Sequence, residues 1–316
     1  MKTILVTGSA GGVSTRVRPY LRNDYRLRLM DLRAAADLAE NETAIVDDIT
    51  DREAVRRAAQ GVDGVLHLAC AYSLDIDFEA TLDANYRAQL YLLDACHEHD
   101  IKRFVFASSH HVLGHHLAEG FAGDHAPVAP DGFYALSKVF GEAACSLYAH
   151  RHGIKALSIR IANVDEQVAD GRRQHIWVSG CDLALLIRIG FEHEGVTNDI
   201  VYGVSHCPAP FFDNARAKEL GYAPQDSALE RLSPARRARC DAGIGRAGLC
   251  RRPLCAAVAH RQNTGQDRVM KIRSVEARVV EIPFEARFST SRSAAFTTAA
   301  RDWASRRPHG SRWKRC

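Results

Sequence analysis

A tyrosine and a lysine four residues apart are the first candidates for chemistry. Tyr134 and Lys138 belong to a stretch with a helical pattern, so both side chains fall on one helix face. An ammonium group beside a phenol favours the phenolate, and we expect Lys138 to lower the pKa of Tyr134 toward the working pH. Ser109 follows an apolar run, and its hydroxyl suits a substrate oxygen. These three residues predict removal of a proton from a substrate hydroxyl.

A glycine-rich turn provides the second motif. Gly8, Gly11 and Gly12 follow the apolar run 3–7 and open a helical pattern. Glycines let the backbone approach a pyrophosphate, whose charge the first amides of the helix attract. Asp31 ends the alternating run 26–31, at the spacing of an acid that binds adenosine ribose hydroxyls. Such an acid disfavours a 2′-phosphate, so we predict NAD as the cofactor. Ser14 replaces the usual third glycine, and we expect a slight loss of helix packing.

Short apolar runs alternate with helical patterns and must position these motifs. We expect strands at 3–7, 26–31, 43–46, 64–68, 103–107 and 155–160, and helices at 51–60, 78–100 and 134–152. This alternation predicts an α/β class with a doubly wound parallel sheet, the Rossmann fold. Ligands of such sheets bind at the carboxyl ends of the strands, where the glycine turn and Ser109 both fall.

The net charge of +4 combines two unlike parts. Residues 231–316 contain 20 Lys and Arg against 6 Asp and Glu, whereas residues 1–230 contain 22 against 32. We therefore divide the chain into an NAD-binding domain with a small substrate-binding portion, 1–230, and a basic tail, 231–316, expected to be disordered. The tail has no helical period and few aromatic residues, so we expect no nucleic acid partner.

Composition also bears on the compartment. No apolar run is long enough to span a membrane, and the N-terminal apolar stretch is too short for a signal peptide. Nine cysteines without a CxxC pair favour a reducing compartment, and we expect a cytoplasmic protein. Four histidines cluster at 110, 111, 115 and 116, but no Cys or carboxylate stands at ligand spacing. We therefore expect no metal.

Over residues 1–229 the chain resembles extended short-chain dehydrogenase/reductases of the NAD-dependent epimerase/dehydratase family, and among them bacterial uronate dehydrogenases. The resemblance is carried by TGSAGGVSTRVRP (7–19), FASSHHVLG (106–114), YALSKVFGE (134–142), IRIANVDE (159–166), the region of Arg172, VYGVS (201–205) and FFDNARAKELGYAPQDS (211–227). It implies an oxidoreductase that passes a hydride from C1 of a hexuronate, glucuronate or galacturonate, to NAD and leaves an aldarolactone. It also implies a homo-oligomer.

The resemblance assigns roles to individual residues. Tyr134 would be the catalytic base, Lys138 its activator and Ser109 the hydroxyl partner. The cofactor residues would be Gly8, Gly11, Gly12, Val13, Asp31, Asp48, Ile49, Leu68, Asn85, Tyr134 and Lys138. The sugar acid would be held by Ser73, Ser109, His110, His111, Tyr134 and Arg172, with Arg173 equally basic beside the last. This chain departs from the family on the substrate side, because His110 replaces a usual Asn and Asn163 replaces a small Ser.

Three other functions share part of this pattern. A sugar-nucleotide epimerase uses the same Tyr, Lys and NAD, but it needs a sizeable C-terminal subdomain. A dehydratase requires an acidic pair beside Ser109, where His110 and His111 stand. A regulatory NAD-binding protein without turnover has no need for the complete set of Ser109, Tyr134 and Lys138. The oxidoreductase therefore remains the first hypothesis.

The tail carries a resemblance of its own. Residues 270–295, which begin with Met270, resemble the N-terminus of enolase-superfamily enzymes that act on sugar acids. We therefore hypothesise that residues beyond 230 arise by read-through or a frame shift into a neighbouring gene. An unbroken reading frame recurring in independent isolates would exclude this origin.

Overall fold

The computed structural model describes residues 1–116, 123, 126–235 and 237. The chain divides into two compact units, Met1–Arg261 and Gln262–Cys316, and the second lies outside the described residues. The predicted tail and its enolase-like stretch, 270–295, lie almost wholly outside them too. The predicted boundary after residue 230 stays a prediction.

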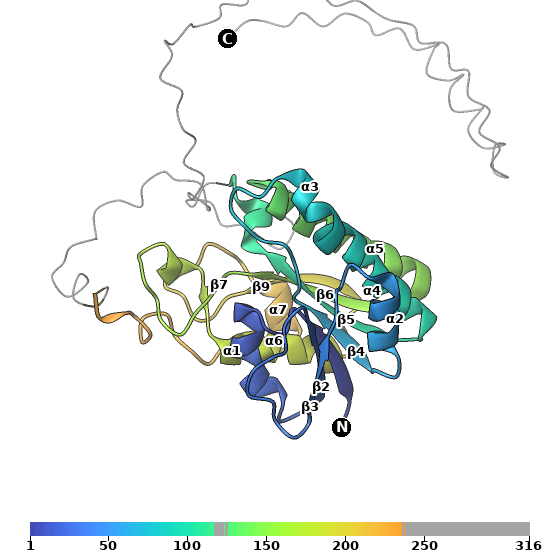
Figure 1. Cartoon of the computed structure of the whole chain (residues 1–316). Coiled ribbons are helices and arrows are strands. Elements are labelled where there is room, and N and C mark those ends of the chain that lie inside the picture. Colours follow the sequence, from blue (N-terminus) through green and yellow to red (C-terminus); the bar gives the residue numbers. More distant parts are fainter. Residues whose placement is uncertain (117–122, 124–125, 236, 238–316) are drawn as a thin grey trace, which may run out of the picture. The chain divides into compact units, whose positions relative to one another are not determined.

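A seven-stranded sheet forms the centre of the first unit, in the order β3-β2-β1-β4-β5-β6-β9 (Figure 1). Every neighbouring pair is parallel, which confirms the predicted Rossmann-like α/β fold. The strands are β1 (Thr3–Thr7), β2 (Arg26–Asp31), β3 (Glu42–Val46), β4 (Gly64–His67), β5 (Arg103–Ser109), β6 (Lys155–Ile161) and β9 (Asn198–Gly203). A second, two-stranded sheet pairs β7 (Asn163–Val164) with β8 (Trp177–Val178).

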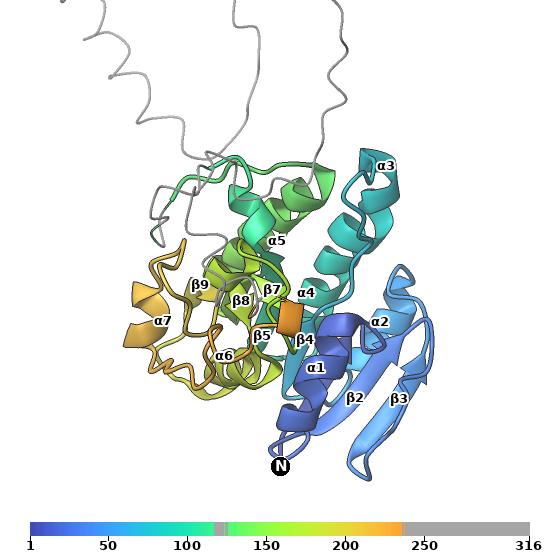
Figure 2. The same cartoon turned by 90° about the vertical axis from the view of Figure 1, so that its left-hand side faces the viewer.

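Helices cover both faces of the sheet (Figures 1 and 2). One apolar core includes residues of α1 (Gly12–Leu21) and α6 (Gly180–Glu192), which pack on each other and on the strands. The opposite core includes residues of α2 (Arg52–Ala59), α4 (Ala88–Glu98) and α5 (Phe133–His152). The short helix α7 (Ala215–Glu219) lies next to β9. Two covered faces explain why the central strands β1, β4 and β5 read as apolar runs, whereas β2, nearer the edge of the sheet, alternates.

The observed elements differ from the predicted ones in two places. The expected helix 78–100 consists of α3 (Phe78–Thr81), a π-helical turn (Leu82–Arg87) and α4. Six strands of the main sheet were predicted, whereas β9 and α6 were not. In β9, residues Asn198 to Ile200 are only half-buried and two of them are polar, so the apolar signal covers just its second half.

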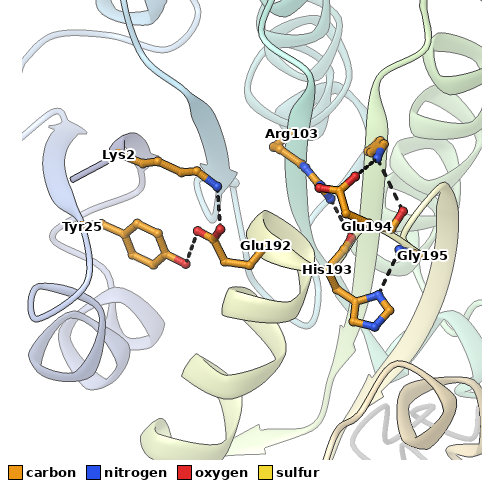
Figure 3. A network of polar contacts seen from close by, with 8 residues as sticks. Lys2, Tyr25, Arg103, Glu192, His193, Glu194 and Gly195 are labelled. Atoms are coloured by element: carbon orange, nitrogen blue, oxygen red, sulfur yellow. Dashed lines mark hydrogen bonds and ion pairs between the residues drawn. The ribbon is translucent and has the colours of Figure 1, made fainter.

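Polar side chains tie α6 to the amino ends of the strands (Figure 3). Glu192 accepts hydrogen bonds from Lys2 at 2.5 Å and from the Tyr25 hydroxyl at 3.1 Å. Arg103 donates to Glu194 at 2.7 Å and to the His193 carbonyl at 2.8 Å. Burial and the nearby Glu192 carboxylate raise the pKa of Tyr25. This network stands at the opposite end of the sheet from the predicted binding edge.

Among the described residues, no helix is both long and apolar enough to cross a membrane.

Candidate active site

A cleft of about 780 Å³ opens at the carboxyl ends of the central strands. It is bordered by segments that follow six strands, from the glycine turn after β1 to the residues after β6. The predicted site residues that line it are Gly8, Gly11, Gly12, Val13, Asp31, Asp48, Ile49, Leu68, Ser109, His110, His111, Tyr134 and Lys138. The parallel sheet therefore gathers at one edge residues that are more than a hundred positions apart in the chain.

The glycine turn is shaped for close approach of the backbone. Gly8 has φ +72°, and a Cβ at this position would lie 2.6 Å from the backbone nitrogen of Ala69. Helix α1 begins after Gly11 without a side-chain cap, which leaves its first amides available to an anion. The Asp31 carboxylate faces this turn, since it accepts a hydrogen bond from the Ala10 amide at 3.0 Å. One end of the cleft thus has the groups that a dinucleotide needs.

Ser14 is accommodated where helix α1 packs, but its buried hydroxyl lowers stability. Its side chain is fully buried, and its hydroxyl oxygen has no hydrogen-bond partner among the described residues. The substitution of serine for the usual third glycine is therefore accommodated in volume but leaves a buried polar atom unpaired.

Tyr134, Lys138 and Ser109 come together at the other end of the cleft. Lys138 is 3% exposed, and its Nζ lies 5.5 Å from the centroid of the Tyr134 ring. Ser109 at the end of β5 is 5% exposed and hydrogen-bonds Tyr134. The three groups predicted to act in removing the substrate proton therefore lie in one pocket.

The expected lowering of the Tyr134 pKa by Lys138 is wrong for the structure as it stands. Burial raises the pKa of Tyr134 well above its ordinary value, and the neighbouring Cys70 thiol raises it further. The hydrogen bond with Ser109 acts in the opposite direction but is outweighed. The reason is that a phenolate loses its hydration in this pocket, and an ammonium group positioned over the ring does not replace that hydration.

A buried ion pair supports the floor of this site. Glu142, one helical turn after Lys138, accepts two hydrogen bonds from Arg160, both at 2.9 Å. The Ser108 hydroxyl donates to the same carboxylate at 2.6 Å. Because Ser108 precedes Ser109, the ion pair holds the end of β5 against the helix that carries Tyr134 and Lys138. Gly141 permits this contact, since a Cβ there would lie 2.2 Å from the Phe106 ring.

His110 and Arg172 form a contact on the substrate side. The Nδ1 of His110 lies 3.0 Å from the Ile161 carbonyl and its Nε2 lies 3.2 Å from Nη2 of Arg172. A carbonyl can only accept, so Nδ1 carries the proton and Nε2 accepts from the guanidinium. Burial lowers the pKa of His110 to about 3, which keeps the ring neutral. Arg173, in contrast, pairs with Asp170 at 3.4 Å and is 40% exposed.

Three predicted site residues are not part of the cleft lining. Arg172 contacts His110, which lines the cleft, and Ser73 is an exposed residue whose hydroxyl accepts from the Asp75 amide. Asn85 was expected beside the cofactor, but its side chain binds the amide and carbonyl of Ala71, at 2.7 and 3.0 Å. It therefore holds the loop after β4, and the π-helical turn presents it to that loop.

Two further residues near Tyr134 were not predicted from the sequence. Tyr72 lines the cleft, and its ring lies edge-to-face on the Tyr134 ring at 4.7 Å between centroids. Asp131 accepts a hydrogen bond from His111 at 2.8 Å. Both belong to loops, where no periodic pattern marks a residue. The only available signal was their position, just after a predicted strand and just before a predicted helix.

Comparison with known proteins agrees with this geometry. Residues 4–165 match the NAD dependent epimerase/dehydratase family. A uronate dehydrogenase of Pseudomonas syringae pv. tomato is 37% identical over 226 residues, which is 71% of this chain and 82% of that protein. A uronate dehydrogenase of Agrobacterium fabrum is 33% identical over 72% of this chain and 86% of its own length. A crystal structure of uronate dehydrogenase from Agrobacterium tumefaciens superposes with a TM-score of 0.71 and 32% identity, covering 76% of this chain and 89% of that one. The chain therefore belongs to the NAD-dependent epimerase/dehydratase family.

Proposed function

We propose that this protein oxidises a hexuronate at C1 with NAD and forms an aldarolactone. The single observation that carries the proposal is the cleft itself, which joins the glycine turn and Asp31 at one end to Ser109, Tyr134 and Lys138 at the other. Similarity to uronate dehydrogenases over most of both chains supports the choice of substrate class. Bound NAD supplies the oxidised nicotinamide ring that accepts the hydride.

In this proposal Tyr134 takes the proton of the C1 hydroxyl while the hydride leaves C1. Ser109 hydrogen-bonds Tyr134 and orients the same hydroxyl. Because burial disfavours the Tyr134 phenolate, the proton transfer needs a positive charge near the phenol when the substrate is bound. Lys138 supplies this charge: its side chain is buried beside Tyr134, and its Nζ lies 5.0 Å from the centroid of the Phe106 ring. The substrate excludes water from the site, and this exclusion strengthens the attraction between the Lys138 ammonium and the Tyr134 phenolate.

Arg172 is the better candidate of the two arginines for the uronate carboxylate. Its guanidinium contacts His110, which lines the cleft, while Arg173 is turned to Asp170. A neutral His110 adds no positive charge of its own and fixes one edge of the Arg172 fork. The fork shape matches the two oxygens of a carboxylate.

The test is to incubate the protein with NAD and D-glucuronate or D-galacturonate and to follow NADH absorbance. We expect turnover, and we expect Tyr134→Phe to abolish it while NAD still binds. Arg172→Ala should raise KM for the uronate at least tenfold, whereas Arg173→Ala should leave it within twofold. A folded, NAD-binding sample that reduces no NAD with either uronate, yet converts a UDP-sugar, would overturn the proposal in favour of an epimerase.

A further inference from the structure

A histidine and a carboxylate form a pair in the wall of the cleft; the family resemblance assigns the histidine, His111, to the sugar acid but gives the carboxylate, Asp131, no role. His111 follows Ser109 in the short helix after β5, and Asp131 precedes Tyr134 in the loop before α5. His111 Nδ1 lies 2.8 Å from Asp131 Oδ2, and their side chains are only 13% and 9% exposed. One member thus comes from each of the two segments that carry the reacting groups.

The hydrogen bond determines how the His111 ring is presented. A carboxylate accepts, so Nδ1 of His111 carries a proton and Nε2 is on the far side of the ring from Asp131. His111 lines the cleft, and its ring lies edge-to-face on the Tyr134 ring at 6.0 Å between centroids. No protein group among the described residues hydrogen-bonds Nε2. The ring therefore has one nitrogen engaged with protein and the other available in a cleft next to Tyr134.

The position of Asp131 is itself built into the backbone. A Cβ on Gly114 would lie 2.3 Å from the carboxylate carbon of Asp131. The φ of Gly114 is −59°, which any residue adopts, so glycine is needed here for space and not for conformation. The carboxylate thus sits against bare backbone, in a place that exists only because residue 114 has no side chain.

We propose that Asp131 is a positioning residue for substrate recognition: it fixes the tautomer and orientation of His111 so that Nε2 accepts a hydrogen bond from a ring hydroxyl of the sugar. At metal sites, carboxylates orient ligand imidazoles in this way, and their loss typically costs 10- to 100-fold in metal affinity or activity; we expect a loss of similar size here. A site built to hydrogen-bond a substrate hydroxyl also rejects an analogue that lacks it, because the polar group of the site is then left unpaired. The role rests on the proposed oxidation of a uronate.

The experiment separates positioning from folding and from chemistry. We expect Asp131→Ala to raise KM for the uronate 10- to 100-fold, with a smaller change in kcat and with NAD affinity within twofold of the original. Asp131→Asn keeps an acceptor oxygen and should recover part of the loss. Gly114→Ala should reproduce the effect of Asp131→Ala, because its Cβ displaces the same carboxylate. In the Tyr134→Phe protein, which does not turn over, Asp131→Ala should cause the same loss of uronate affinity, measured by calorimetry on the NAD complex.

A double variant and a matched control complete the test. If Asp131 acts through His111, then Asp131→Ala added to His111→Gln should raise KM no further than His111→Gln alone. Glu192→Ala removes another carboxylate that binds an aromatic side chain, at the far end of the sheet, and should leave KM unchanged (Figure 3). An unchanged KM in Asp131→Ala, or additive effects in the double variant, would overturn the inference. Absence of uronate oxidation in the unmodified protein would instead count against the proposed function.

Discussion

The buried ion pair beneath Ser109 and Lys138 allows a quantitative test of how the site is supported. Glu142 and Arg160 are 6% and 3% exposed, and the carboxylate binds both nitrogens of the guanidinium fork as well as the Ser108 hydroxyl. Glu142→Gln keeps the volume but leaves the Arg160 charge buried without its partner. Breaking such a pair on one side costs about 3 to 5 kcal/mol. For a domain of this size that loss lowers Tm by roughly 6 to 20 °C.

The assay is urea unfolding at neutral pH, followed by circular dichroism and by tryptophan fluorescence so that agreement of the two tests two-state behaviour. Glu53→Ala is the matched control, because Glu53 pairs with Arg56 on the surface, where both side chains are about half-exposed. We expect it to cost less than about 0.5 kcal/mol. Replacing Glu142 and Arg160 together by Leu and Met should be less damaging than Glu142→Gln alone. A loss below about 1 kcal/mol in Glu142→Gln, or a double variant worse than the single one, would refute the reasoning.

Two more predictions concern the glycine turn at Gly8 and the loss of stability at low pH. Gly8→Ala should weaken NAD binding at least tenfold, measured by fluorescence titration, because its Cβ lies 2.6 Å from the Ala69 nitrogen and its φ is positive; affinity within threefold would contradict this. Burial lowers the pKa of His67 and of His110 to about 3, so between pH 6.5 and 3 the unfolded chain binds more protons and stability falls as the pH falls. Each histidine contributes a slope of at most about 1.4 kcal/mol per pH unit. His67→Gln should remove one such share from the slope of unfolding free energy against pH, and an unchanged slope would show that this ring does not stay neutral.

The sequence predicted the cofactor end of the site better than the substrate end. Gly8 follows β1, Asp31 ends β2 and Asp48 lies two residues after β3, and the carboxyl ends of parallel strands meet at one edge. The places of Gly8 and Asp31 follow from the strand pattern and spacing, whereas Asp48 is implied only by the family resemblance. The segments around Ser73, Asp131 and Arg172 are loops, whose paths depend on tertiary contacts such as those between Asn85 and Ala71.

The charge state of Tyr134 could not be predicted from spacing either. The four-residue separation from Lys138 places both side chains on one face of α5, which is a local property of a helix. The pKa of the phenol depends instead on its burial and on the charges of Cys70, Tyr72 and Asp131, which come from other segments of the chain and raise it. A pKa is a sum over all these neighbours, so a motif of two residues gives only one contribution to it.

The strand order has a consequence for how the protein is made. Strand β1 lies inside the sheet, β2 and β3 extend it in one direction, and β4, β5, β6 and β9 are then added in chain order in the other. During synthesis from the N-terminus, no strand has to enter between two neighbours that have already paired. The residues that line the cleft end at Val164, whereas Arg172 follows them. The segments that line the dinucleotide pocket therefore leave the ribosome before the arginine proposed to select the substrate does.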